Sequence, residues 1–127
     1  MTIEQFIRTQ IETVDNLRAL LLLRSDPQAR WDAELVSTRL YLPPQDAARV
    51  LGDLASKGLI NVSSSTYYRY GPPLPEFAPL IEQLAQIDQE HPVTLVNLIY
   101  ARPEDVKAFV EAFHGLKGGL RNPLPPP

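Results

Sequence analysis

Two prolines and a glycine enclose the segment that most restricts how this chain folds. Pro43 and Pro44 precede, and Gly58 follows, a stretch in which apolar residues recur at helical spacing. Those residues are Ala47, Val50, Leu51 and Leu54. Proline costs little at the first position of a helix, and glycine readily adopts the left-handed conformation that ends one. The sequence therefore predicts a helix from Pro44 to Lys57 with one buried face.

Two helical segments are expected before Pro43. The first runs from Ile3 to Leu23 as one long helix, which Ser25-Asp26-Pro27 ends. Its apolar stripe consists of Ile3, Ile7, Ile11, Val14, Leu17 and Leu21. The second covers residues 33–41, with Asp32 as its N-cap. The residues expected to face inward from it are Leu35, Val36 and Leu40.

A hairpin is expected after Gly58. Residues 59–62 and 66–70 are rich in β-formers and flank three serines, Ser63 to Ser65. Side chains alternate between the two faces of a strand, so we expect Tyr68 and Tyr70 to cover the core. Trp31 is interpreted as a core anchor for the first two helices. Residues 71–75 are a proline-rich connector.

The C-terminal third is predicted to be helical. One apolar stripe contains Phe77, Leu80, Ile81, Leu84 and Ile87. Residues 93–100 would also suit a strand, but a helix beginning near Pro92 is favoured. A last helix is expected from Pro103, with Val106, Phe109, Val110 and Phe113 buried. The predicted organisation is a domain over 1–71, a helical extension over 72–114 and a flexible tail over 115–127.

Composition excludes several classes of function. The 127 residues include no cysteine, so neither disulfides nor thiolate metal sites can form. The longest apolar run, residues 19–23, is far shorter than a membrane span, and residues 1–5 carry no base typical of a signal peptide. We expect a soluble, cytoplasmic protein that does not bind membranes.

No catalytic or cofactor motif is recognised. The chain has no glycine-rich phosphate loop, nucleophile elbow or paired-carboxylate motif. His91 and His114 lie far apart in the sequence and flank no cluster with metal-ligand spacing. The expectation is therefore a protein that is not an enzyme and that uses neither a metal nor a cofactor.

Helix, short helix, turn, helix and hairpin is the element order of a winged helix-turn-helix. The stretch from Asp32 to Tyr70 resembles that superfamily of bacterial regulators, which includes MarR-like and ArsR-like proteins. The closest points are Glu34-Leu35 at the start of the second helix, Leu42 in the turn, and Lys57-Gly58-Leu59-Ile60 at the exit into the wing. Leu51 and Leu54 match the apolar pair of the third helix. The resemblance implies a mainly α fold with a small β-hairpin, extended here by C-terminal helices.

The resemblance also implies a DNA-binding transcriptional regulator. Its third helix would enter the major groove of double-stranded DNA and its wing would contact the backbone. The residues implied to contact DNA are Ser37, Thr38, Arg39, Gln45, Ala48, Arg49, Ser64, Thr66 and Arg69. Asp46 and Asp53, on the same helix, would repel phosphate. The chain carries a net charge of −3, so a homodimer joined by the first and C-terminal helices would help compensate for weak attraction to DNA.

Two alternatives remain open. A winged helix can serve as a protein-interaction adapter that does not bind DNA, and the net acidity and the tyrosine-rich wing favour binding to another regulatory protein. A ligand sensor is the second alternative. Its pocket would be lined by aromatic and apolar residues of the C-terminal helices, namely Phe77, Leu98, Tyr100, Phe109 and Phe113.

Overall fold

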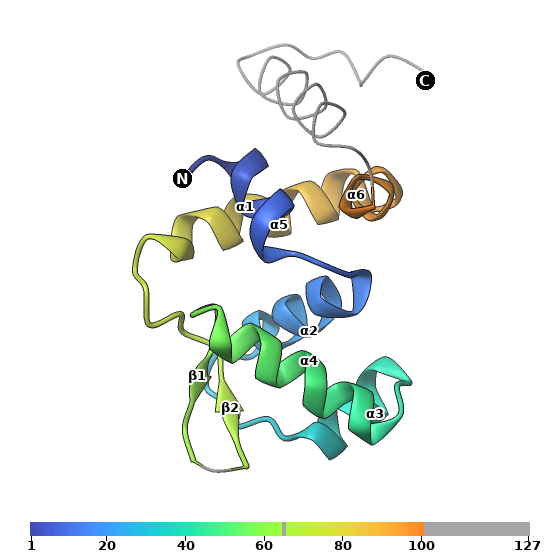
Figure 1. The fold of residues 1–127 in the computed structure, drawn as a ribbon, viewed down its shortest axis with the longest axis vertical. Coiled ribbons are helices and arrows are strands. Elements are labelled where there is room, and N and C mark those ends of the chain that lie inside the picture. Colours follow the sequence, from blue (N-terminus) through green and yellow to red (C-terminus); the bar gives the residue numbers. More distant parts are fainter. Residues whose placement is uncertain (65, 101–127) are drawn as a thin grey trace.

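A computed structural model describes residues 1–64 and 66–100. Within these ranges the chain is mainly helical, with one small antiparallel hairpin. In chain order the elements are α1 (Ile3–Gln10), α2 (Val14–Ser25), α3 (Ala33–Leu40), α4 (Pro44–Ser56), β1 (Asn61–Val62), β2 (Tyr68–Arg69), α5 (Phe77–Glu90) and α6 (Pro92–Ile99). Figure 1 shows two tiers, with α1, α5 and α6 in the upper tier and α2, α3, α4 and the hairpin in the lower.

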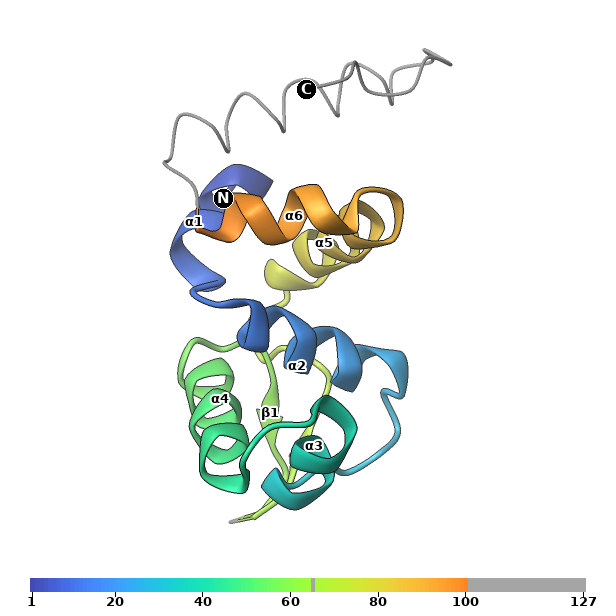
Figure 2. The same cartoon turned by 90° about the vertical axis from the view of Figure 1, so that its right-hand side faces the viewer.

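One hydrophobic core runs through both tiers. In the upper tier the ring of Phe6 in α1 packs against that of Phe77 in α5, with 5.5 Å between centroids and a tilt of 60°. In the lower tier α2 lies against α3 and α4, and its buried residues Leu17, Leu20 and Leu23 belong to the same cluster. Figure 2, a quarter turn away, shows α2 between the upper helices and the α3–α4 pair.

The prediction of one long N-terminal helix is wrong. The chain leaves the helix after Gln10 and begins a new one at Val14. The Thr13 side chain accepts a hydrogen bond from the Asn16 amide at 3.1 Å and so caps the second helix, a contact typically worth about 1 kcal/mol. The break lets α1 turn away from α2 and place Phe6 on α5.

The predicted first residues of α3 and α4 are confirmed, and each helix ends one residue earlier than predicted. The Asp32 carboxylate accepts from the Leu35 amide at 2.8 Å, and Pro44 is the first residue of α4. Gly58 ends this segment with a φ of 77°. The predicted buried face of α4 is correct in full, comprising Ala47, Val50, Leu51 and Leu54. The inward position predicted for Leu35 is wrong, since this residue is 36% exposed, and Val36 is the residue of α3 that fills the core.

The hairpin forms where it was predicted, but its strands are shorter. Asn61 pairs with Arg69 and Val62 pairs with Tyr68. Trp31 adds a third partner, because its backbone exchanges two hydrogen bonds with Tyr68, at 2.8 and 2.7 Å. The Trp31 side chain is buried, as expected of a core anchor. Tyr68 and Tyr70 are half-buried against the core, as predicted, but Arg69 between them is also half-buried, so burial does not alternate here.

The C-terminal helices also follow the sequence prediction as far as the structure describes them. The α5 stripe is buried as expected, and residues 93–99 are helical within α6, whereas Tyr100 is its C-cap. The predicted helix from Pro103 and the tail over 115–127 lie outside the described residues. The proposed division at residue 71 stays a prediction, although the contact between Phe6 and Phe77 crosses it. Over the part that is described, no helix is long and apolar enough to cross a membrane.

An ion pair on the surface joins the two tiers. Arg24 at the end of α2 donates to both carboxylate oxygens of Glu82 in α5, at 2.9 and 2.5 Å. The hydrogen bond from Arg24 lowers the pKa of Glu82, and the same bond raises the pKa of Arg24. Nearby, burial raises the pKa of Tyr70, and the charge of Glu82 raises it further.

We expect Gly58→Ala to destabilise the protein by about 1–3 kcal/mol, since an L-residue is strained at this φ. The added Cβ would also meet Leu74 Cδ1 at 3.0 Å. Gly52→Ala, in the middle of α4, is the matched control because a Cβ added there would have no atom within 4 Å. The control should gain about 0.5–1 kcal/mol. Urea denaturation of both variants measures the difference, and equal effects would contradict this account of Gly58.

The pair between Arg24 and Glu82 should make stability depend on pH. The folded-state pKa of Glu82 lies below its ordinary value of 4.5, so the pair stabilises the fold above the unfolded pKa. That contribution disappears as the pH falls through the folded-state pKa. Both side chains are partly exposed, so Glu82→Gln should cost less than about 1 kcal/mol at neutral pH.

Urea titrations of Glu82→Gln and of the wild type across the acidic range measure this dependence. The two free energies of unfolding should converge at low pH. Glu76→Gln is the control, because Glu76 forms none of the ion pairs found among the described residues. A difference between wild type and Glu82→Gln that persists at low pH would show that the ion pair is not its source.

Candidate nucleic-acid interface

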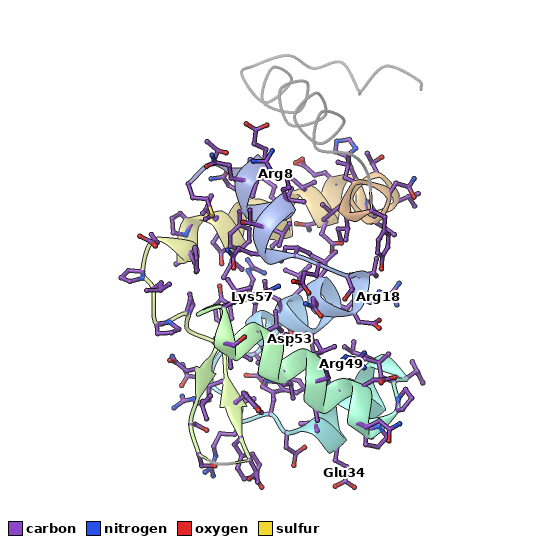
Figure 3. All side chains as sticks on the ribbon, in the orientation of Figure 1. Arg8, Arg18, Glu34, Arg49, Asp53 and Lys57 are labelled. Atoms are coloured by element: carbon purple, nitrogen blue, oxygen red, sulfur yellow. The ribbon has the colours of Figure 1, made fainter. Side chains whose placement is uncertain are left out.

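The predicted contact residues gather around α3, α4 and the hairpin in the lower tier. An open hollow of about 320 Å³ lies between these elements. Its lining residues are Asp32, Ala33, Glu34, Ala48, Thr66 and Tyr68. Two predicted residues that are distant in sequence, Ala48 on α4 and Thr66 in the hairpin loop, therefore border the same space. Figure 3 labels Arg49, Asp53 and Lys57 along α4, with Glu34 below it.

The outer face of α4 is open to solvent. The helix buries one side in the core, and the helical period places Gln45, Ala48 and Arg49 on the opposite side, where all three are exposed. Gly52 continues this row, and a Cβ added to it would have nothing within 4 Å. The side chains of the row are short except at Gln45 and Arg49, so another molecule can approach the helix closely.

Arg49 is not an isolated positive charge. Its Nη1 lies 3.2 Å from Asp46 Oδ1, one turn earlier on the same helix. The Arg49 side chain is 65% exposed, so water screens the pair strongly and the two groups are held together weakly. Asp46 therefore offsets the charge of Arg49 without holding its side chain in place, and it competes only weakly with an outside anion for the guanidinium.

The two hydroxyls predicted on α3 are used within the chain. Ser37 is half-buried, and its Oγ donates to the Leu42 carbonyl oxygen in the turn between α3 and α4. Thr38 Oγ1 donates to the Glu34 carbonyl oxygen at 3.1 Å. Ser37 is therefore first a structural residue of the turn, whereas Thr38 is exposed and still presents its oxygen to solvent.

Two arginines on this side of the molecule stack on aromatic rings. The Arg39 guanidinium carbon lies 5.5 Å from the centroid of the Trp31 ring. Arg30, which was not among the predicted contacts, lies 5.5 Å from that of Tyr67 in the hairpin. Stacking of this kind fixes the direction of a guanidinium while leaving its donors usable. The sequence signal for Arg30 was its position directly before Trp31. Arg30 is distant from the hairpin in sequence, and its closeness to the hairpin is seen only in space.

The hairpin contributes polar groups at its tip. Ser64 and Thr66 are exposed, whereas Arg69 in β2 is half-buried. The amides of Ser63 and Ser64 both donate to the Tyr67 carbonyl oxygen, at 2.9 and 3.4 Å, and so close the loop. The predicted wing residues therefore lie on one short hairpin, with hydroxyls at the tip and a base on the strand.

The net charge of this face is close to neutral. Its arginines are Arg30, Arg39, Arg49 and Arg69. Its carboxylates are Asp32, Glu34, Asp46 and Asp53. Asp32 is committed to capping α3, but Glu34 is exposed and lines the hollow between α3, α4 and the hairpin. The face therefore presents hydrogen-bond donors with fixed directions rather than a strong positive field.

A contact that sequence reasoning missed holds the far end of α4. Lys57 Nζ lies 3.1 Å from Glu12 Oε1 and donates to the Gln10 carbonyl oxygen at 3.4 Å. The lysine thereby ties the end of α4 to the link between α1 and α2. No local pattern relates Lys57 to residues so distant in sequence. The contact lies at the end of α4 away from Gln45.

The structure describes only part of the set predicted to line a ligand pocket. Phe77 and Leu98 lie in the core, whereas Tyr100 is exposed, and Phe109 and Phe113 fall outside the described residues. Across residues 1–64 and 66–100, the structure contains no group of three or more potential metal-ligating His, Cys, Asp or Glu side chains.

Fold and site together define a mainly helical protein with a small hairpin. Its helix α4 and the hairpin share one polar, near-neutral face. No family model, curated protein or solved structure matches this chain.

Proposed function

We propose that this protein is a winged-helix DNA-binding regulator of transcription, with α4 in the major groove and the hairpin as its wing. The observation that carries the proposal is the backbone pairing of Trp31 with Tyr68. It adds a strand residue between α2 and α3 to the hairpin, which gives the order helix, strand, helix, helix, hairpin. That order positions a short β-ribbon beside the exposed row of α4, the arrangement a winged helix uses to bind duplex DNA.

The side chains on α4 support readout of bases. Gln45 and Arg49 are of the types that recognise adenine and guanine through paired hydrogen bonds in the major groove. Ala48, between them, leaves room for close approach. Contacts to the phosphate backbone would come from Thr38, Arg39 and the wing residues Ser64, Thr66 and Arg69. We add Arg30 to this proposed set because it lies over the ring of Tyr67 in the hairpin.

Duplexes selected from a random library at low salt provide the test, with fluorescence polarisation as the measurement. Arg49→Ala should weaken binding by about 1–3 kcal/mol and relax the preference at one base position. Asp46→Asn should strengthen binding, because it removes a charge that offsets Arg49 and repels phosphate. Arg8→Ala is the matched control, since it removes the same charge from an exposed position on α1 in the upper tier.

The outcomes separate cleanly. If the wild type binds no duplex at micromolar concentration, the proposed function is wrong. If Arg49→Ala and Arg8→Ala weaken binding equally, the effect is one of net charge, and α4 is not the reading helix.

A protein-interaction adapter is the second candidate, and one observation favours it. Glu34 lines the hollow between α3, α4 and the hairpin, where a duplex seated on α4 would bring phosphates. A partner protein with basic side chains would fit such a face better than DNA. In the duplex experiment an adapter leaves every sequence unbound, while a stoichiometric protein partner is captured and is lost on substitution of Tyr67 or Arg49.

We propose further that the protein acts as a homodimer, joined through α6. Helix α6 contains no charged residue, yet Val93 is 72% exposed and Tyr100, directly after it, is 66% exposed. The apolar residues of α1, by contrast, are already buried within the chain. A second copy packed on α6 would cover Val93 and Tyr100 and would place two α4 helices in one complex, which raises avidity for a duplex.

Val93→Asp should weaken self-association at least tenfold, because a carboxylate would lose its water in the interface. Sedimentation equilibrium over a range of concentrations measures the effect. Val62→Asp on β1 is the matched control, since Val62 is also an exposed valine but lies in the lower tier. A wild-type protein that stays monomeric at every concentration would overturn the dimer.

A further inference from the structure

The turn between α3 and α4 holds a tyrosine in a strained conformation. Tyr41 has φ 58° and ψ 44°, in the left-handed region, and within residues 1–64 and 66–100 it is the only non-glycine residue with positive φ. An L-residue is strained there because its Cβ approaches the carbonyl oxygen that follows. Glycine would occupy this position without that strain.

Hydrogen bonds around Ser37 make the turn rigid. The amides of Tyr41 and Leu42 both donate to the Ser37 carbonyl oxygen, the second at 3.1 Å. The Ser37 hydroxyl in turn donates to the Leu42 carbonyl oxygen. The backbone of Tyr41 is thereby fixed from both sides, so its side chain leaves the turn in one direction.

The fold makes no use of the Tyr41 ring. The residue is 94% exposed, the highest value among the exposed large hydrophobic residues of the described chain. Its neighbours Leu40 and Leu42 are half-buried and supply the packing at this point. A strained residue whose side chain contributes nothing to the core points to a contact with another molecule.

We propose that Tyr41 contacts the DNA backbone beside the N-terminal end of α4, with its phenol O–H donating to a phosphate oxygen. The inference rests on the proposed function, since it requires a duplex seated on α4. The turn lies just before Gln45 at the start of α4, so the DNA strand that borders the major groove would pass beside the turn. Residues 40–45 carry no charge, so no carboxylate within the turn opposes a phosphate there. Tyrosine is among the side chains that supply such contacts.

A phosphate contact of this kind can be recognised from three measurements: the affinity for a selected duplex, the affinity for an unrelated duplex, and the dependence of affinity on salt. Tyr41→Phe removes only the hydroxyl and should weaken binding about five- to tenfold, equally for a selected duplex and an unrelated one. A neutral phenol displaces no counterion, so the dependence of affinity on salt should not change in slope. Arg49→Ala provides the contrast, because it should affect the selected duplex more than the unrelated one.

Stability provides the second arm. Tyr41→Gly relieves the left-handed strain and should raise Tm by about 2–5 °C while binding weakens at least as much as in Tyr41→Phe. Tyr41→Phe keeps the backbone strain and should leave Tm unchanged. Tyr70→Phe is the control for loss of a tyrosine hydroxyl, because Tyr70 is half-buried and is not among the residues proposed to contact DNA, and it should bind duplex like the wild type.

The results distinguish the two levels of inference. A wild-type protein that binds no duplex overturns the proposed function and this contact with it. If the wild type binds and Tyr41→Phe binds equally well, the contact alone is wrong and α4 remains the reading helix. Loss of a captured partner protein on Tyr41→Phe, with duplex binding unchanged, would likewise overturn the phosphate contact and assign the ring to a protein interface.

Discussion

The pairing of Trp31 with Tyr68 is the interaction on which the lower tier depends. A hairpin whose strands are as short as β1 and β2 is marginal in isolation, because it buries little and leaves both edges open. Trp31 donates one hydrogen bond to Tyr68 and accepts one from it, and these bonds pair part of one edge and attach it to the start of α3. The buried indole then fixes this junction against the core, and Arg39 covers its ring. The hairpin consequently has a defined place beside α4 instead of projecting freely.

Local chemistry made the lower tier predictable. Asp32, Pro44 and Gly58 each act through the backbone of their own helix end, so a short stretch of sequence contains all the information needed. The buried face of α4 followed from period alone. The same reasoning wrongly predicted that Leu35 is buried, because α3 is short and Val36 is its one fully buried residue. Apolar spacing likewise gave no sign that the Ser37 hydroxyl donates to the carbonyl oxygen of Leu42, a residue outside the helix.

Periodicity could not reveal the break between α1 and α2. The apolar stripe continues through Ile7, Ile11 and Val14, so spacing alone favours one helix. The signals that decide otherwise are the caps at Thr2 and Thr13, which sequence patterns contain but apolar spacing ignores. The contact of Phe6 with Phe77 then stabilises the turn between the two helices. Pairs such as Lys57 with Glu12 and Arg24 with Glu82 depend on that tertiary arrangement, and no local rule anticipates them.

The charges on the α4 face bear directly on how such a protein would select its site. Non-specific binding to DNA is driven by the release of counterions and requires an excess of bases near the phosphates. Here Asp46 offsets the charge of Arg49, and Glu34 faces the hollow beside the hairpin, so this contribution is small. Under the proposed function, most of the binding energy must then come from directed hydrogen bonds and from the presence of two α4 helices in one dimer. A near-neutral α4 face would therefore bind weakly to DNA of arbitrary sequence. The few side chains that reach the bases would then set the ratio of the affinity for the target site to the affinity for other DNA.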